Sequence, residues 1–307
     1  MSAPQHANDS ARPRAGRRRG RLIAAGIALG AVASLAILGA AQLASEPVGA
    51  QAPGARETVV EAAGVSQHVA CQGTGGPTVV IVNGLGADSS EWNDEMPSLA
   101  EKSRVCVVDR AGTGDSPQRQ KNTNGPVENA DELLAGLAAA GERGPYVFVG
   151  WSYGGVVSLV AAKDSVQSPS RDQLAGLVLV DPSLPEEYRT IDTHGWVEGG
   201  IPLNMSAGEA AVAQLKLGDV PVVVLEAGQP LPKPADEKYQ HERLQALAEI
   251  STNSVFGTVP DSPHDIAAYS PRSIVTATSA VVDSYRRDNA PLGQCPSDFA
   301  DNEIVCE

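Results

Sequence analysis

Short runs of β-branched and apolar residues alternate with Ala- and Leu-rich segments along most of this 307-residue chain. The runs are nearly continuous in apolar character, as expected for strands that are buried on both faces. We predict strands at residues 78–82, 105–108, 146–149, 177–180, 220–225 and 254–259, and helices at 129–140, 154–163, 236–250 and 271–287. This alternation is typical of the α/β class, with a mostly parallel sheet and helices on both faces. Sites in such sheets form beyond the carboxyl ends of the strands.

The stretch from residue 182 to residue 219 breaks this alternation. It contains Trp196, several Gly and Pro residues, and a short helical pattern around residues 207–216. It begins where the predicted strand 177–180 ends, at the edge of the sheet where sites form. We predict a small lid insertion here, with a long surface loop as the alternative.

The first 52 residues predict an export segment. Residues 17–21 contain four arginines, and an uncharged, mostly apolar run follows over residues 22–44. A basic start followed by an apolar core is typical of a secretory signal, and the small residues at 50–52 suit cleavage by a signal peptidase. The run is also long enough for a helix of about 1.5 Å rise per residue to span a bilayer. A cleaved signal and a retained anchor with a cytoplasmic amino terminus both stay open.

Both readings place residues 53–307 on the outer side of the cytoplasmic membrane, as one domain with a tail at 289–307. The cysteines all lie in this exported part: Cys71, Cys106, Cys295 and Cys306. An even number of cysteines in an oxidising compartment predicts disulfides. Of the three pairings that are possible, we favour Cys295 with Cys306 in the tail, and Cys71 with Cys106 on neighbouring strands.

Charge is distributed unevenly between these two parts. The first 52 residues hold six of the 23 basic residues, and the remainder carries 17 basic and 35 acidic residues. An acidic body argues against a nucleic-acid partner, because phosphate binding needs a basic face. The spacing of Cys and His does not suggest a metal site, no cofactor is implied, and the sequence leaves the oligomeric state open.

Ser152 is the candidate nucleophile. The run Gly150-Trp151-Ser152-Tyr153-Gly154 follows the predicted strand 146–149 and precedes a predicted helix. A Gly-x-Ser-x-Gly pattern between a strand and a helix is the nucleophile elbow. The turn requires glycine at positions 150 and 154, because a side chain at either position would collide with the adjacent strand or helix. The tight turn strains the serine backbone by about 1–3 kcal/mol.

A serine hydroxyl needs a base to become an effective nucleophile. His264 follows the last predicted strand and precedes the final predicted helix, which puts it at the carboxyl edge of the sheet. We therefore favour His264 as the base. His194 lies in the predicted lid, and His241 lies among charged residues of a predicted helix, where we expect a solvated side chain.

The base in turn needs a carboxylate that holds its tautomer. Asp181 ends the strand 177–180, Glu226 ends the strand 220–225, and Asp236 is a weaker third candidate. We favour Asp181 as the acid and keep Glu226 as the alternative. An Asp-Pro step also commonly opens a turn, which is the structural alternative for Asp181.

The segment Asn83-Gly84-Leu85-Gly86 follows the first strongly apolar strand. Glycine lets the backbone approach a ligand closely. We predict that the N–H groups of Leu85 and Tyr153 bind the oxyanion that forms during the reaction, with a plain turn as the alternative for the first segment.

The segment Asp109-Arg110-Ala111-Gly112-Thr113-Gly114-Asp115-Ser116 could be mistaken for a phosphate-binding loop. It lacks the Gly-Lys-Ser/Thr of that motif. We interpret it as a structural turn in which Asp109 and Arg110 tie neighbouring loops together.

These segments occur in the order found in the α/β-hydrolase fold family, which the chain resembles over roughly residues 58–288. It looks closest to a short-lid, exported branch of actinobacterial type. The resemblance implies Ser152 as nucleophile, His264 as base, and the Leu85 and Tyr153 amides as oxyanion donors.

Some positions depart from the family pattern. The family's acid follows the strand after the elbow helix in some members and the next strand in most, where Gly-x-x-Asp is usual. Here that position reads Leu225-Glu226-Ala227-Gly228, which favours Asp181. Trp151 and Asn83 each stand where the family commonly has His, and we expect neither side chain to be needed for the chemistry.

The resemblance implies an exported serine hydrolase that forms an acyl-enzyme from a small carboxylic ester. Peptidase or amidase activity and cofactor-free perhydrolysis would use the same residues and stay as alternatives. A dehalogenase is excluded if the elbow is right, because it needs a carboxylate at position 152. An inactive relative that serves as a surface binding protein is a further alternative, against which Ser152 and His264 argue.

Overall fold

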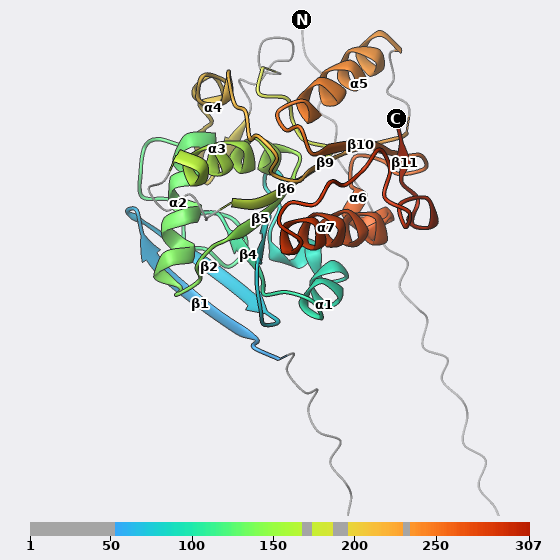
Figure 1. The fold of residues 1–307 in the computed structure, drawn as a ribbon. Coiled ribbons are helices and arrows are strands. Elements are labelled where there is room, and N and C mark those ends of the chain that lie inside the picture. The colour runs from blue at the N-terminus through green and yellow to red at the C-terminus, as the bar shows by residue number, and fades with distance from the viewer. Residues whose placement is uncertain (1–52, 168–173, 187–195, 230–233) are drawn as a thin grey trace, which may run out of the picture. The chain divides into compact units, whose positions relative to one another are not determined.

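The computed structural model describes residues 53–167, 174–186, 196–229 and 234–307 (Figure 1). The predicted export segment and His194 lie outside these ranges. Within them, the structure contains no helix that combines the length and apolar character needed to cross a membrane.

A nine-stranded sheet forms the centre of the described part, in the order β1-β2-β4-β3-β5-β6-β9-β10-β11. Its strands are β1 (Arg56–Ala62), β2 (Val65–Gln72), β3 (Thr78–Val82), β4 (Val105–Asp109), β5 (Tyr146–Trp151), β6 (Leu174–Val180), β9 (Val222–Ala227), β10 (Ser254–Val259) and β11 (Val305–Cys306). The six strands from β4 to β10 in this order run parallel to one another, whereas β1, β2 and β11 each pair antiparallel. The predicted α/β fold with a mostly parallel sheet is therefore confirmed.

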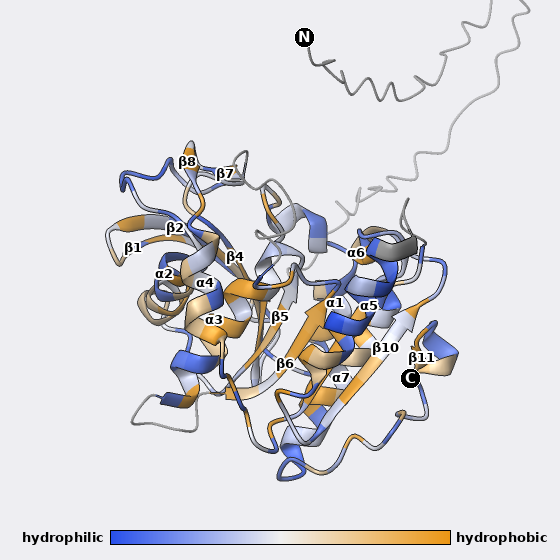
Figure 2. Ribbon diagram, turned by 90° about the horizontal axis from the view of Figure 1, so that it is seen from above, coloured by the Kyte–Doolittle hydropathy of each residue, from blue (hydrophilic) through white to orange (hydrophobic). Residues whose placement is uncertain are grey.

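Helices cover both faces of the sheet (Figure 1). They are α1 (Glu95–Ala100), α2 (Pro126–Ala139), α3 (Tyr153–Gln167), α4 (Met205–Val212), α5 (Pro234–Ala248), α6 (Ile266–Tyr269) and α7 (Pro271–Arg286). Alternate residues of the central strands enter two separate cores: on β5, Phe148 packs on the side of α2, α3 and α5, and Val147 packs on the side of α1 and α7. Figure 2 shows the hydrophobic residues concentrated on β5, β6 and α3.

The predicted lid region contains a hairpin of β7 (Val197–Glu198) and β8 (Ile201–Pro202), followed by α4. The helix begins two residues earlier and ends four residues earlier than the sequence pattern suggests. Asn204 caps it, because its side-chain oxygen accepts a hydrogen bond from the Ala207 N–H. Residues 187–195 of the region lie outside the described part.

Three strands of the nine-stranded sheet were not predicted from the sequence. β1 and β2 form an antiparallel hairpin in which β1 is largely exposed, so its apolar positions do not form a continuous run. β11 is only two residues long. The predicted strand 220–225 also begins two residues too early. Pro221 has no N–H to donate, and the ladder starts at Val222.

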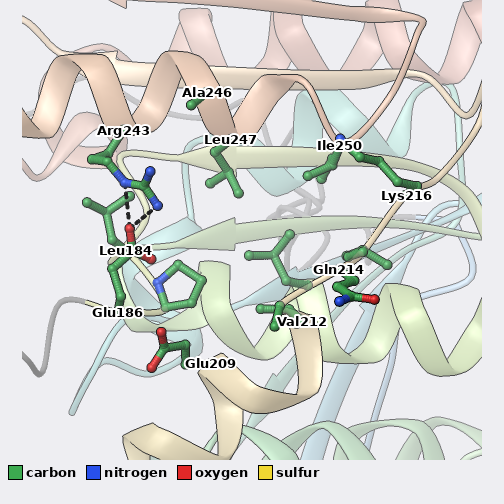
Figure 3. Close-up of a pocket in the computed structure, with 14 residues that line it drawn as sticks. Leu184, Glu186, Glu209, Val212, Gln214, Lys216, Arg243, Ala246, Leu247 and Ile250 are labelled. Atoms are coloured by element: carbon green, nitrogen blue, oxygen red, sulfur yellow. Dashed lines mark hydrogen bonds and ion pairs between the residues drawn. The ribbon is translucent and has the colours of Figure 1, made fainter.

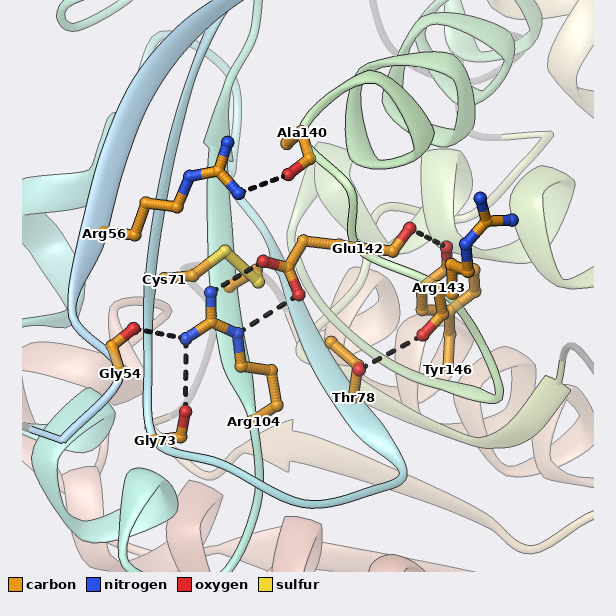
Figure 4. Close-up of a disulfide and its surroundings, with 11 residues drawn as sticks. Gly54, Arg56, Cys71, Gly73, Thr78, Arg104, Ala140, Glu142, Arg143 and Tyr146 are labelled. Atoms are coloured by element: carbon orange, nitrogen blue, oxygen red, sulfur yellow. Dashed lines mark hydrogen bonds and ion pairs between the residues drawn. A yellow bond between two sulfur atoms is a disulfide. The ribbon is translucent and has the colours of Figure 1, made fainter.

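Both favoured disulfides are present. Cys71 and Cys106 are register partners on the antiparallel strands β2 and β4, with their Cα atoms 4.1 Å apart (Figure 4). Cys295 pairs with Cys306, which joins the tail to β11 at the edge of the sheet. Paired cysteines are compatible with export to an oxidising compartment.

Candidate active site

Ser152 lies at the tight turn between β5 and α3, with φ of 52° in the left-handed region. The glycines beside it have no room for a side chain. A Cβ at Gly150 would lie 2.4 Å from the Ser158 Oγ, and a Cβ at Gly154 would lie 2.1 Å from the Val82 carbonyl oxygen. The backbone therefore turns sharply and exposes the serine, at a cost of about 1–3 kcal/mol.

The structure brings together the three side chains that we predict to act on one another. The Ser152 Oγ lies 2.9 Å from the His264 Nε2, and the His264 Nδ1 lies 2.6 Å from the Asp181 Oδ2. Ser152, Asp181 and His264 follow β5, β6 and β10, whose carboxyl ends share one edge of the sheet. The imidazole is 56% exposed, so a substrate can approach it from solvent.

Asp181 is 3% exposed, and its orientation is fixed from two sides. Its Oδ1 accepts hydrogen bonds from the Ala227 N–H at 3.1 Å and from the Gln240 side chain at 3.4 Å. Its φ is 38°, so this carboxylate, like Ser152, follows its strand through a left-handed turn. These contacts leave Oδ2 directed at His264.

Glu226, the alternative acid, is engaged elsewhere. Its Oε2 lies 2.7 Å from the His241 Nδ1, and the Thr258 hydroxyl donates to it at 3.4 Å. The other ring nitrogen of His241 lies 3.1 Å from Glu307. The expectation of a merely solvated His241 is therefore wrong, because helix α5 turns this ring toward the end of β9. Asp236, the weaker third candidate, is exposed in the first turn of α5.

This pairing shifts the protonation of both partners. The hydrogen bond with Glu226 raises the pKa of His241 above its ordinary value. Burial raises the pKa of Glu226 in spite of the hydrogen bond from His241.

Trp151 contributes more than the sequence suggests. Its indole N–H donates to the His264 carbonyl oxygen at 2.9 Å, and the two ring centroids lie 5.6 Å apart. A Cβ at Gly84 would also lie 2.8 Å from the indole ring. The indole is therefore packed against both the base and the segment that contains Leu85.

The predicted oxyanion segment lies beside the elbow. Val82, at the end of β3, is the register partner of Gly150 on β5. Leu85 follows three residues later, and Tyr153 is the first residue of α3, so both lie at the carboxyl edge of neighbouring strands. Asn83 is also structurally engaged, because its Oδ1 accepts from the Trp92 indole at 2.7 Å.

The segment 109–116 ties loops together, as predicted. Asp109 is fully buried and accepts hydrogen bonds from the Ser89 N–H at 2.7 Å and the Asp115 N–H at 3.2 Å. Arg110 donates to the carbonyl oxygens of Asn83 and Gly84. Through these hydrogen bonds, the turn holds the predicted oxyanion segment in place.

Arg110 also forms a buried ion pair with Glu198 of the β7–β8 hairpin, which no local sequence pattern predicts. Burial alone would lower the pKa of the arginine, but the Glu198 carboxylate outweighs it and the pKa is raised. Burial would likewise raise the pKa of Glu198, but Arg110 holds it below its ordinary value. The two residues are 88 positions apart, and no local pattern marks them as partners.

His68, Asp109 and Asp115 are close enough to hold a metal ion together. The Asp109 Oδ2 already lies 3.1 Å from the His68 Nδ1 and 3.2 Å from both the Ser89 hydroxyl and the Asp115 N–H. Because these donors satisfy the carboxylate, we assign the cluster to the turn.

A cavity of about 420 Å³ lies between α3, α4 and α5 (Figure 3). Leu159, Leu184, Val212 and Leu247 give it an apolar lining, and an ion pair between Glu186 and Arg243 lies at one end. The Ser183 N–H, one residue before Leu184, donates to the Ser152 carbonyl oxygen at 3.0 Å. Leu184 of the lining therefore follows a residue that is hydrogen-bonded to the nucleophile turn.

Residues 79–300 match the alpha/beta hydrolase family. YqjL of Bacillus subtilis, an uncharacterized protein, is 29% identical over 236 residues, which cover 73% of this chain and 90% of YqjL. A thermophilic esterase from Thermogutta terrifontis is similar in structure, with a TM-score of 0.56 and 21% identity over 76% of this chain and all of that one. The haloalkane dehalogenase DatA of Agrobacterium tumefaciens gives the same TM-score at 16% identity over 76% of this chain and 97% of its own.

Proposed function

We propose that this chain, which belongs to the α/β hydrolase family, is a serine hydrolase that cleaves carboxylic esters through an acyl-enzyme. The observation that carries this proposal is the hydrogen-bonded series from Ser152 through His264 to Asp181. A carboxylate nucleophile, which dehalogenase chemistry requires, is absent from position 152.

In the proposed reaction, His264 takes the proton of Ser152 as the hydroxyl oxygen attacks the acyl carbonyl. Asp181 holds the imidazole in the tautomer that presents Nε2 to the serine and stabilises the imidazolium. The amides of Leu85 and Tyr153 donate to the oxyanion, and the imidazolium then protonates the departing alcohol. Water attacks the acyl-enzyme with the same base, which releases the acid and restores the serine.

We also propose that the cavity between α3, α4 and α5 receives the acyl chain of the substrate. Leu159 on its wall lies seven residues after Ser152, which is about 10 Å along a helix. Long acyl chains reach this distance and acetyl groups do not. In a series of nitrophenyl esters, we expect kcat/KM to rise with chain length. A Val212→Trp substitution should remove that rise and leave acetate hydrolysis unchanged; an unchanged rise would contradict the assignment.

A fluorophosphonate probe tests the hydrolase proposal itself. We expect stoichiometric labelling of residues 53–307 and no labelling of the Ser152→Ala variant. Absence of labelling in the unchanged protein, or labelling that survives in the variant, would favour a binding protein. Matched nitrophenyl esters and nitroanilides separate an esterase from an amidase or peptidase, and an assay with hydrogen peroxide detects perhydrolysis.

We propose that the enzyme acts outside the cytoplasm, either secreted or anchored through residues 1–52. The support is the basic and apolar order of that segment and the two disulfides. The intact mass of the exported protein distinguishes the two forms, since cleavage after Ala52 removes the whole segment.

A further inference from the structure

The Arg110 guanidinium, which is almost fully buried at the end of β4, binds one carboxylate and two backbone carbonyls at once. Its Nε and Nη2 donate to the two carboxylate oxygens of Glu198 at 2.6 and 2.7 Å. Its Nη1 and Nη2 donate to the carbonyl oxygens of Asn83 at 2.6 Å and Gly84 at 2.5 Å. The rigid, planar group therefore fixes two successive peptide units of the oxyanion segment.

These contacts set the direction of the Leu85 N–H. The peptide between Gly84 and Leu85 is trans, so its C=O and N–H point in opposite directions. Since the Gly84 C=O points at Arg110, the Leu85 N–H points away from it. The next amide, that of Gly86, donates to the Glu198 Oε1 at 3.0 Å. The ion pair therefore holds the segment on both sides of the Leu85 amide.

Glu198 belongs to the hairpin of β7 and β8, not to the central sheet. The hairpin backbone is held against the turn after β4: a Cβ at Gly112 would lie 2.6 Å from the Gly199 Cα. The Asn124 side chain donates to the Glu198 carbonyl oxygen at 2.9 Å. The hairpin therefore contributes a charged group to the loop next to the nucleophile.

We propose that Arg110 and Glu198 are positioning residues that orient the Leu85 amide as an oxyanion donor. The orientation of this amide then depends on the position of the β7–β8 hairpin, which carries Glu198. This inference rests on the proposed hydrolase function. Neither side chain touches the reacting atoms; both act through the backbone between Asn83 and Gly86.

The chain offers a matched control in Arg104, which precedes β4. Its Nε and Nη2 donate to Glu142 at 3.1 and 2.6 Å, and its Nη1 donates to the carbonyl oxygens of Gly54 and Gly73. The bonding pattern resembles that of Arg110, but the carbonyls belong to segments at the opposite edge of the sheet.

The test compares two double variants, Arg110→Met with Glu198→Leu and Arg104→Met with Glu142→Leu. Removing both charges leaves neither buried without its partner, and such replacements often preserve folding. For the first pair we expect kcat on a nitrophenyl ester to fall about 10²-fold, the typical loss of one oxyanion donor. KM should change less than about threefold, because the donor acts mainly on the transition state. For the second pair, kcat should stay within about threefold of the unchanged enzyme.

A second variant, Glu198→Gln, keeps the shape of the side chain and tests the hairpin contribution alone. We expect it to lower kcat with little change in KM, less than the double variant does. If either Glu198 variant is folded by circular dichroism and retains kcat within threefold, the positioning role is wrong. Equal losses of kcat in the Arg104 pair would show a general structural effect and also overturn it. Failure of the hydrolase proposal is a different result, because the unchanged protein would then cleave no ester and react with no fluorophosphonate.

Discussion

The two ends of β4 carry arginines with similar hydrogen-bond patterns and different surroundings. Arg104 lies before the strand and Arg110 lies after it. Each donates hydrogen bonds to one carboxylate and to two backbone carbonyls. The side chains of Arg104 and Glu142 are 15% and 11% exposed, near the disulfide between β2 and β4 (Figure 4). Those of Arg110 and Glu198 are 4% and 2% exposed, beside the nucleophile turn.

The comparison shows that the type of interaction does not reveal its role. At the start of β4, the Arg104 guanidinium holds the segment before β1 and the segment after β2 together, which stabilises this edge of the sheet. After the strand, the Arg110 guanidinium holds the loop that contains the proposed oxyanion donor Leu85. Binding and catalytic sites form at the carboxyl ends of parallel strands, and the first two predictions below test that division between the two edges.

The largest expected effect is at the carboxyl edge. Asp181→Asn should lower kcat by about 10⁴-fold, because the amide favours the wrong tautomer of His264. Glu226→Gln is the matched control at the end of the neighbouring strand and should change kcat only mildly. Steady-state kinetics on a nitrophenyl ester measures both, and the reverse ranking would move the acid to Glu226.

The next effect, at the opposite edge, is on stability rather than on turnover. Replacing Cys71 and Cys106 with alanine opens a loop of 35 residues, which the chain-entropy account values at about 4 kcal/mol of unfolding free energy. Urea unfolding measures the loss. We expect kcat at a temperature where the variant is folded to stay within about threefold, and a larger fall would contradict the separation of the two edges.

Glu95 shows what happens to a buried carboxylate that has no arginine. It is fully buried in the first turn of α1, and neither carboxylate oxygen has a side-chain partner. Burial raises its pKa to about 7, whereas that of Glu198 is lowered. Since the folded state binds this proton more tightly, the contribution of Glu95 to stability is greatest below pH 4.5 and is lost as the pH rises through about 7.

Glu95→Gln should therefore increase the unfolding free energy at pH 8 by about 3 kcal/mol and change it little at pH 4. Urea unfolding at both pH values measures the difference. Glu91→Gln, at an exposed position nearby, serves as the control. A Glu95→Gln variant that is no more stable than the unchanged protein at pH 8 would show that the carboxylate is satisfied there.

The smallest effect is expected at the partly exposed His241. Its raised pKa means that the ion pair with Glu226 and Glu307 stabilises the fold below about pH 6.5 and is lost as the pH rises through the folded-state pKa. His241→Gln should lower stability by less than about 1 kcal/mol at pH 5.5 and have no effect at pH 9. Thermal unfolding at both values measures it, with Lys238→Gln as the control. A constant difference across this range would rule out the charge as its source.

The sequence was most informative where one short segment determines the structure. The strand at Thr78–Val82 has the predicted bounds because every residue in it is buried. The elbow at Ser152 follows from glycines whose neighbours leave no space. By contrast, Asp181 and Glu226 both end strands of the sheet, and tertiary contacts separate them: Asp181 contacts His264, whereas Glu226 contacts His241 of α5. Arg110 and Glu198 meet only through the hairpin, so their pairing depends on tertiary packing that no local pattern encodes.

The left-handed backbone at Ser152 and Asp181 limits which residues evolution can try there. Aspartate and asparagine adopt this conformation readily, whereas β-branched residues are strained in it. Threonine is therefore a poor substitute for the nucleophile, although it carries the same hydroxyl. An exchange of serine for aspartate at position 152 meets no such barrier, so this scaffold has an easier evolutionary route to a new nucleophile class than to a bulkier alcohol.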